Sequence, residues 1–304
     1  MIDHILEFKN VYQKYPDKSG NLRTILNNIN LKISRGELIT IVGPTGCGKS
    51  TLLRLILGSE KPYQGQVLIN GTEIQAPSRN RGVVFQHYSL YPNRTVKQNV
   101  MFGLEMEKFS LLDPLFKSKE CRKKRMEFTQ KADQYLEQVG LLEHADKYPH
   151  QLSGGMRQRA AIAQAMVMEP EVLMMDEPHG ALDVGTREEM QIFILDQWKR
   201  EHQTIFFVTH DLEEAIFLGS RILVLSPFYS GNQGEPSDGS KIVKDIPISW
   251  PLPRPTDIKH SKEFNDIMKD IRHEGLDPEY LQHIEYFDLR HEDATWWETL
   301  KKQA

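Results

Sequence analysis

Four short segments of the chain are almost wholly apolar and rich in β-branched side chains, a pattern that predicts buried β-strands. These segments are residues 37–42, 172–175, 204–208 and 222–225. Polar and apolar residues do not alternate along them, so both faces of each strand should be covered, as in a parallel α/β sheet. Polar residues follow the first three segments at once, at 43–50, 176–177 and 209–211. Because ligands gather at the carboxyl ends of parallel strands, we expect these ends to converge on one site.

The pattern becomes helical between about residues 87 and 170. Long segments there, such as 120–139, carry charged residues around an apolar stripe. This pattern predicts a helical subdomain inserted into the sheet, because strand-like segments lie on both sides of it.

The C-terminal part begins with two loop-like stretches. Residues 230–240 are rich in Gly, Ser and Pro, and residues 247–255 are rich in Pro. The tail from 261 to 304 is predicted to be mainly helical. We therefore expect a main domain at 1–250 and a C-terminal extension, mainly helical, at 251–304.

Composition narrows the possible function classes. The chain has 304 residues, of which 39% are hydrophobic and 26% charged, and a net charge of −4, which favours an ordinary globular protein without an electrostatic field for nucleic acid. Its apolar runs are far below the roughly 20 residues that cross a bilayer, and its start does not resemble a secretory signal. Two cysteines, Cys47 and Cys121, predict neither a disulfide framework nor a zinc site.

A glycine-rich phosphate loop follows the first predicted strand and opens a helix. It has the pattern G-x-x-x-x-G-K-[ST] and comprises Gly43, Pro44, Thr45, Gly46, Cys47, Gly48, Lys49, Ser50 and Thr51. Its N–H groups should turn toward phosphate oxygens at the positive end of the helix. We expect Lys49 to reach the β- and γ-phosphates and the Ser50 hydroxyl to help bind Mg²⁺. This loop predicts a nucleoside triphosphatase, but it does not indicate which class of these enzymes.

Two adjacent carboxylates end the second predicted strand. Asp176 is expected to bind Mg²⁺, directly or through water, and Glu177 to orient and deprotonate the attacking water. An isolated Asp-Glu pair is usually a surface turn. Its position after an apolar strand, downstream of a phosphate loop, favours the catalytic interpretation.

A second anion site is predicted where Ser153, Gly154 and Gly155 open a helix. One domain already has its own phosphate loop, so this second site is expected to serve the nucleotide of another molecule. Here the sequence resembles the ABC ATPase family, whose signature segment closes over the γ-phosphate of ATP held by the partner subunit. The resemblance covers roughly residues 5–272.

Several further roles are implied by this resemblance. Gln86 matches the glutamine that contacts Mg²⁺ and water, and Asp183 matches the loop aspartate that communicates across the dimer. His210 matches the switch histidine that holds the γ-phosphate and positions the catalytic glutamate. Tyr15 matches the aromatic residue that stacks on adenine, with Tyr12 as an alternative.

The resemblance implies a P-loop NTPase fold of RecA-like type: a mostly parallel α/β sheet, an N-terminal antiparallel β element, the helical subdomain and the extension. It also implies an ATP-hydrolysing subunit that dimerises around two ATP with Mg²⁺. The partner would be a second copy or a paralogous ATPase, with integral membrane permease subunits and a substrate-binding protein, and no nucleic acid. The expected location is peripheral, on the cytoplasmic face of the inner or plasma membrane.

The part after residue 220 is similar to the nitrate, sulfonate and taurine importer ATPases, which implies import of a small anion. Extra residues at 109–125 and the tail beyond about 275 depart from that group. The basic run at 117–125 is either a solvated helix face or a membrane-surface contact, and the tail is a regulatory, dimer-bracing or inert element. Two other functions stay open: a non-transport ABC ATPase acting on nucleic acid or ribosomes, and a regulatory nucleotide-binding subunit.

Overall fold

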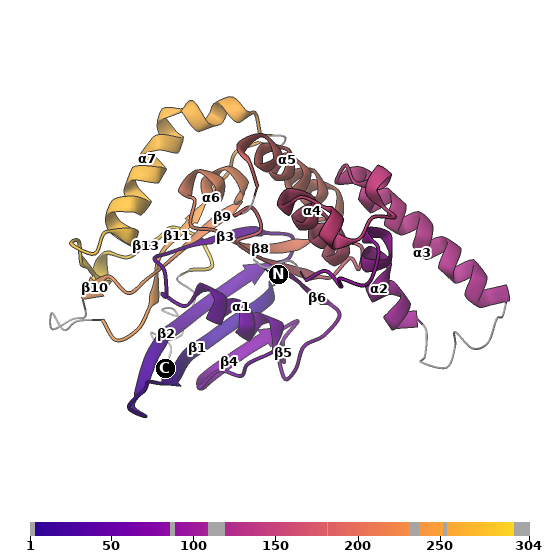
Figure 1. Cartoon of the computed structure of the whole chain (residues 1–304). Coiled ribbons are helices and arrows are strands. Elements are labelled where there is room, and N and C mark those ends of the chain that lie inside the picture. The colour runs from indigo at the N-terminus through magenta and orange to yellow at the C-terminus, as the bar shows by residue number, and fades with distance from the viewer. Residues whose placement is uncertain are drawn as a thin grey trace. The chain divides into compact units, whose positions relative to one another are not determined.

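The computed structural model describes residues 4–85, 89–108, 119–180, 182–230, 237–251 and 254–294 (Figure 1). It divides into two compact units. Unit 1 combines Met1–Ser78 with Trp198–Ala304, and unit 2 is Arg79–Gln197. Among the described residues, no helix combines the length and the apolar character needed to cross a lipid bilayer. The domain boundaries predicted from the sequence, 1–250 and 251–304, stay a prediction.

Unit 1 begins with a four-stranded antiparallel sheet, as predicted. Its strand order is β2-β1-β4-β5, formed by β1 (His4–Pro16), β2 (Leu22–Ser34), β4 (Gln64–Ile69) and β5 (Thr72–Glu73). Buried and partly exposed positions alternate over much of β1 and β2, because one face of the sheet packs on the core while the other meets solvent.

Unit 1 also holds a second, mostly parallel group of strands. In the order β13-β11-β9-β3-β8 it comprises β13 (Asp288–Leu289), β11 (Lys241–Pro247), β9 (Arg221–Ser226), β3 (Leu38–Val42) and β8 (Thr204–Val208). Strand β3 pairs parallel with both β8 and β9, whereas β11 pairs antiparallel with β9. Every residue of β3 and β8 is buried, which confirms strands covered on both faces.

Two helices of unit 1 come after β3 and β8, and a third comes later, after β11. They are α1 (Lys49–Leu57), α6 (Leu212–Leu218) and α7 (Lys262–Asp270), preceded by a 3₁₀ turn η4 (Thr256–His260). Helix α1 buries four aliphatic side chains, among them Leu52 and Ile56, and ends at Gly58 in the left-handed conformation, a common helix C-terminus.

Unit 2 holds the predicted helical region together with two strands. Strands β6 (Arg81–Val84) and β7 (Val172–Asp176) pair in parallel. Helices α2 (Val96–Lys108), α3 (Lys119–Gln138) and α4 (Gly154–Met166) pack on one another, and α5 (Val184–Glu201) follows β7. Most of the predicted extra segment at 109–125 lies outside the described residues, and its end forms the start of α3.

The described part of the C-terminal extension is mostly helical, and it also contains two short strands that its sequence does not predict. Helix α7 continues into a single π-helical turn, η5 (Ile271–Leu276), as expected for a helical tail. Beyond it the described chain forms two-residue strands, β12 (Gln282–His283) and β13, joined through a 3₁₀ turn, η6 (Ile284–Tyr286). Strand β12 pairs with β10 (Tyr229–Ser230) in a separate two-stranded sheet, and β13 pairs with β11. Tertiary pairing, rather than local propensity, therefore sets their extended conformation.

Candidate functional site

The phosphate loop connects β3 to α1 in unit 1, and its shape depends on glycine. Gly46 and Gly48 have φ values of 79° and 105°, in the left-handed region that favours glycine. A Cβ on Gly43 would lie 2.2 Å from the Leu225 carbonyl oxygen. Gly48 also precedes α1 without a side-chain cap, so no side chain of the N-cap residue competes for the first N–H groups of this helix. This is the arrangement that suits an anion.

Lys49 lies inside this loop. Its side chain is buried, and its ammonium donates to the carbonyl oxygens of Gly43 at 2.8 Å and Pro44 at 3.1 Å. Each of these hydrogen bonds can be exchanged for one to a phosphate oxygen, because the flexible Lys stem allows the ammonium to move. The loop and its lysine therefore fit a nucleotide phosphate.

Cys47 of the same loop is buried, and burial raises the pKa of its thiol, with Lys49 opposing the shift. The thiol therefore stays protonated at neutral pH, and we expect slow alkylation. Its place within the loop agrees with a small residue that packs rather than reacts.

Tyr15 lies near the end of β1, and its hydroxyl is engaged in a small polar cluster. The hydroxyl donates a short hydrogen bond to Glu60 and accepts one from Arg54 at 3.3 Å, while Arg54 pairs with Glu60 at 2.7 Å. Sequence reasoning missed Arg54 and Glu60, because their partner is about 40 residues away in the chain. The cluster thus holds the Tyr15 side chain by its hydroxyl group. Stacking of the Tyr15 ring on adenine stays a prediction.

His210 lies in the loop between β8 and α6, and its side chain is exposed. The two residues beside it are tied to the helix that follows. The buried Thr209 hydroxyl donates to Glu214 at 2.7 Å, and the Asp211 carboxylate accepts from the backbone N–H groups of Glu213 and Glu214 at 2.9 and 3.3 Å. The first turn of α6 therefore fixes the backbone on both sides of His210.

The Ser-Gly-Gly segment lies in unit 2, at the start of α4. Ser153 is the N-cap, and its hydroxyl accepts from the Met156 N–H at 3.3 Å, as the sequence predicts. Gly154 and Gly155 form the first turn, and a Cβ on Gly155 would lie 3.1 Å from Leu182 Cδ2. The exposed Ser153 and the two small residues leave the helix start accessible to an anion.

Asp176 and Glu177 also lie in unit 2, where β7 ends. Glu177 has a φ of 49°, a left-handed conformation that costs a non-glycine residue on the order of 1–3 kcal/mol and is typical of functional sites. Sequence patterns gave no sign of this backbone strain.

Asp183 precedes α5 and accepts hydrogen bonds from the backbone N–H of Thr186 at 3.0 Å and from its hydroxyl at 2.8 Å. These bonds lower the pKa of Asp183, the backbone one most. The aspartate therefore stays charged and caps α5, in addition to any role across a dimer.

The predicted site residues are thus distributed over both units. Unit 1 holds Tyr15, the phosphate loop and His210. Unit 2 holds the Ser-Gly-Gly segment, Asp176, Glu177 and Asp183. Gln86 lies outside the described residues, and its expected contact with Mg²⁺ stays a prediction.

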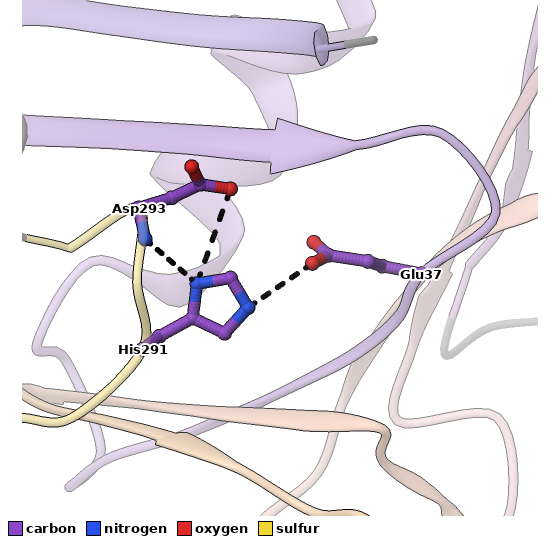
Figure 2. A group of neighbouring side chains, drawn as sticks. All are labelled: Glu37, His291 and Asp293. Carbon is purple, nitrogen blue, oxygen red and sulfur yellow. Dashed lines mark hydrogen bonds and ion pairs between the residues drawn. The ribbon is translucent and has the colours of Figure 1, made fainter. Parts of the chain in front are cut away.

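A further cluster of metal-binding residue types lies in unit 1, where Glu37, His291 and Asp293 meet. Figure 2 shows the imidazole between the two carboxylate residues. His291 Nε2 lies 3.3 Å from Glu37 Oε1, and His291 Nδ1 accepts from the Asp293 N–H at 3.2 Å. Both ring nitrogens are thus engaged within the protein, so we interpret the cluster as an attachment of the tail to the start of β3 rather than as a cation site.

Comparison with known proteins gives a consistent result. The sequence profile described as "ABC transporter" matches residues 26–180. The nitrate import ATP-binding protein NrtD of Synechocystis sp. is 44% identical over 221 residues, which is 73% of this chain and 77% of the relative. The aliphatic sulfonates import ATP-binding protein SsuB of Bacillus subtilis is 38% identical over 268 residues, which is 88% of this chain and 92% of the relative.

Solved structures agree with the sequence comparison. The dimeric structure of the bacterial ABC transporter cassette MJ0796 matches with a TM-score of 0.66 and 30% identity, covering 81% of this chain and 99% of that one. A dimeric post-hydrolysis state of the same cassette, bound to ADP and Pi, matches with a TM-score of 0.65 and 29% identity over the same shares of the two chains.

Proposed function

This chain belongs to the ABC transporter family and hydrolyses ATP, and on this premise we propose that it powers the import of a small anion such as nitrate, a sulfonate or taurine. The phosphate loop, with Lys49 buried among its carbonyl groups, is the observation that supports ATP binding. The choice of cargo class is supported by the kinship with nitrate and sulfonate import proteins.

The chain's own residues account for how the phosphates are held. Lys49 would exchange its two carbonyl contacts for β- and γ-phosphate oxygens, and the first N–H groups of α1 would receive the same anion. Ser50 and Asp176, with Gln86, would hold Mg²⁺, which when bound neutralises charge that develops on the phosphates. Tyr15 would supply its ring face to adenine.

Glu177 would then orient and deprotonate the attacking water, and His210 would hold the γ-phosphate and position Glu177. Fixed positions of these groups matter more than covalent chemistry, because phosphoryl transfer is accelerated mainly by positioning and electrostatics. The strained backbone of Glu177 and the doubly anchored loop of His210 support such roles.

ABC cassettes dimerise, and a second copy of this chain, or a paralogous subunit, would complete each site. Ser153, Gly154 and Gly155 of one copy would close over the γ-phosphate held by Lys49 of the other, and Asp183 would lie at the same interface. Loss of the γ-phosphate removes the anion that bridges the copies, so the dimer would reopen after hydrolysis.

Integral membrane permease subunits would receive this motion, and a substrate-binding protein would deliver the anion. The chain would accordingly be peripheral, on the cytoplasmic face of the membrane. Nucleic acid is not an expected partner, because the net charge is −4 and phosphate backbones need basic surfaces.

The test is to purify the tagged chain from detergent-solubilised membranes and identify its companions by mass spectrometry. We expect integral membrane subunits, and ATP hydrolysis by the reconstituted complex that rises when nitrate, a sulfonate or taurine is supplied with the binding protein. Cations and neutral sugars serve as control solutes. Stimulation by DNA or ribosomes, with no membrane protein recovered, would instead support a non-transport ATPase.

A further inference from the structure

The C-terminal extension lies directly against the loop that carries His210. A groove of about 480 Å³ is lined on one side by residues of that loop and of α6, from His210 to Glu213, and on the other by Met268, Arg272 and Leu276. The last three come from α7 and η5. Helices α6 and α7 pack against each other, as Figure 1 shows within unit 1.

The extension holds α6 at its first turn through Lys259 of η4. The Lys259 ammonium pairs with Glu213 at 3.0 Å. The Lys259 side chain is 11% exposed, compared with 51% for Glu213, so the lysine is the more buried partner of this ion pair. Glu213 and its neighbour Glu214 are the residues whose N–H groups bind Asp211, so this ion pair acts on the turn that anchors His210.

The extension also holds the opposite end of α6. The Lys259 ammonium lies 4.8 Å from the Phe217 ring centroid, a cation–π distance. Arg254 is 5% exposed and donates a short hydrogen bond to the Phe217 carbonyl oxygen. A guanidinium at the last carbonyl groups of a helix is favourable, because the helix dipole is negative there. Burial lowers the pKa of Arg254 to about 10, which is still well above neutral pH, so the guanidinium stays charged at the helix end.

The extension itself is anchored to the central strands. Lys244 of β11 is fully buried and pairs with Asp270 at 2.8 Å and Glu274 at 2.5 Å, both on the extension. Gly275 packs on β9 so closely that a Cβ would lie 2.5 Å from Val224 Cγ1. Contacts made from such an anchored element can restrain α6 rather than move with it.

We propose that Lys259 is a positioning residue for ATP hydrolysis, which fixes the first turn of α6 through Glu213 and thereby fixes His210. The proposal rests on the role proposed above for His210. Direct contacts within unit 1 make up each step of the connection: Lys259 to Glu213, the N–H groups of Glu213 and Glu214 to Asp211, and Thr209 to Glu214. A displacement of about 1 Å in a catalytic group can cost on the order of 100-fold in rate.

The test compares Lys259→Ala, Lys259→Arg and the control Lys262→Ala, which removes an exposed lysine at the start of α7 outside the groove. We expect Lys259→Ala to lower kcat about 5- to 10-fold while KM for ATP stays within about twofold, because the phosphate loop that binds the nucleotide is unchanged and only the position of His210 is lost. Lys259→Arg should restore at least half of kcat, and Lys262→Ala should equal wild type. Melting temperatures, measured alongside, report whether each variant is folded.

Three outcomes would overturn the proposal: an unchanged kcat in folded Lys259→Ala, a change confined to KM, or no rescue by arginine. If Lys259→Ala does not fold, Glu213→Gln breaks the same ion pair from the exposed side, and an unchanged kcat there counts equally against it. The variant His210→Ala distinguishes failure of the proposed role of Lys259 from failure of the proposed role of His210. Loss of hydrolysis in His210→Ala with normal Lys259→Ala refutes only the positioning role, whereas full activity of His210→Ala refutes the role of the histidine itself.

Discussion

At the scale of single residues, two glycines of the phosphate loop have the left-handed backbone conformation, but they differ in the space available for a side chain. Around Gly46 no atom lies within 4 Å of where a Cβ would be, whereas a Cβ on Gly48 would lie 2.8 Å from Leu26 Cδ2 and 2.9 Å from Ile25 Cγ2. Alanine at Gly46 therefore adds only the conformational cost of positive φ. Alanine at Gly48 adds that cost and overpacking of the β2 side chains.

We expect Gly46→Ala to lower the free energy of unfolding by about 1–2 kcal/mol and Gly48→Ala by about 2–4 kcal/mol. Urea denaturation without nucleotide measures both, and the two variants serve as matched controls for each other. Equal losses in the two variants would mean that the loop relaxes around the added methyl group.

A second residue-scale prediction concerns Glu177. Glu177→Gln keeps the shape of the side chain but removes its basicity, so ATP should bind normally while hydrolysis falls about 10²- to 10⁴-fold. With ATP and Mg²⁺ the variant should accumulate as a dimer in light scattering. Glu143→Gln, at an exposed turn of unit 2, is the control and should stay at wild-type rates. A monomeric Glu177→Gln under these conditions would contradict the proposed dimer.

Sequence patterns located these residues because their chemistry is local: a glycine loop, a carboxylate pair and a capping serine. They did not locate Glu60 as the partner of Tyr15, or the connection from Lys259 through α6 to His210. Those contacts join residues 45 or more positions apart, and only the tertiary fold brings them together. The positive φ of Glu177 has no sequence signal either, because the strain comes from its surroundings.

At the scale of elements, strands β3, β7, β8 and β9 follow from apolar runs that leave little choice of state. The tail is helical from Lys262 to Leu276, as its sequence predicts. Beyond Leu276 its strands are only two residues long and depend on pairing with β10 and β11, whereas the polar, charged tail sequence itself favours a helix. Tertiary pairing overrides local propensity most easily in such short segments.

The attachment of this tail to β3 gives a pH-dependent prediction. Glu37, one residue before β3, bonds to His291 of the tail and lies 3.2 Å from Arg221 of β9. Burial alone would raise the pKa of Glu37, but the hydrogen bond from His291 and the attraction of Arg221 outweigh burial and lower it. A carboxylate with a depressed pKa in the folded state stabilises the protein above its unfolded pKa, near 4.5, and this stabilisation is lost as pH falls through the folded value.

Glu37→Gln should therefore lower the free energy of unfolding by about 1.5–3 kcal/mol at pH 7, the range for hydrogen bonds to charged groups. The difference from wild type should shrink at pH values below 4.5. Urea titrations at pH 7 and near pH 4 measure it, with Glu279→Gln at an exposed turn as the control. A difference that grew on acidification would mean that Glu37 is not the stabilising anion of this cluster.

At the scale of the whole molecule, two copies are needed because each proposed site combines the lysine loop of one chain with the serine-glycine helix start of another. Lys49→Ala removes the first contribution, and Ser153→Arg should block the second by placing a long side chain at an exposed helix start. A dimer of either variant alone has two defective sites. A mixed dimer concentrates both defects in one site and leaves the other with an intact Lys49 and an intact Ser153.

We therefore expect each variant alone to be nearly inactive, and an equimolar mixture to regain hydrolysis. With random pairing, half of the dimers are mixed and each has one intact site, so about a quarter of wild-type activity should return if single sites work independently. Each variant mixed with itself at the same total concentration is the control. If the mixture stays as inactive as its components, either the sites do not form between copies or they hydrolyse ATP only when both sites of a dimer are intact. A single-turnover measurement on a purified mixed dimer separates these cases. If the site is shared between copies, the intact site must still bind ATP and hydrolyse it once.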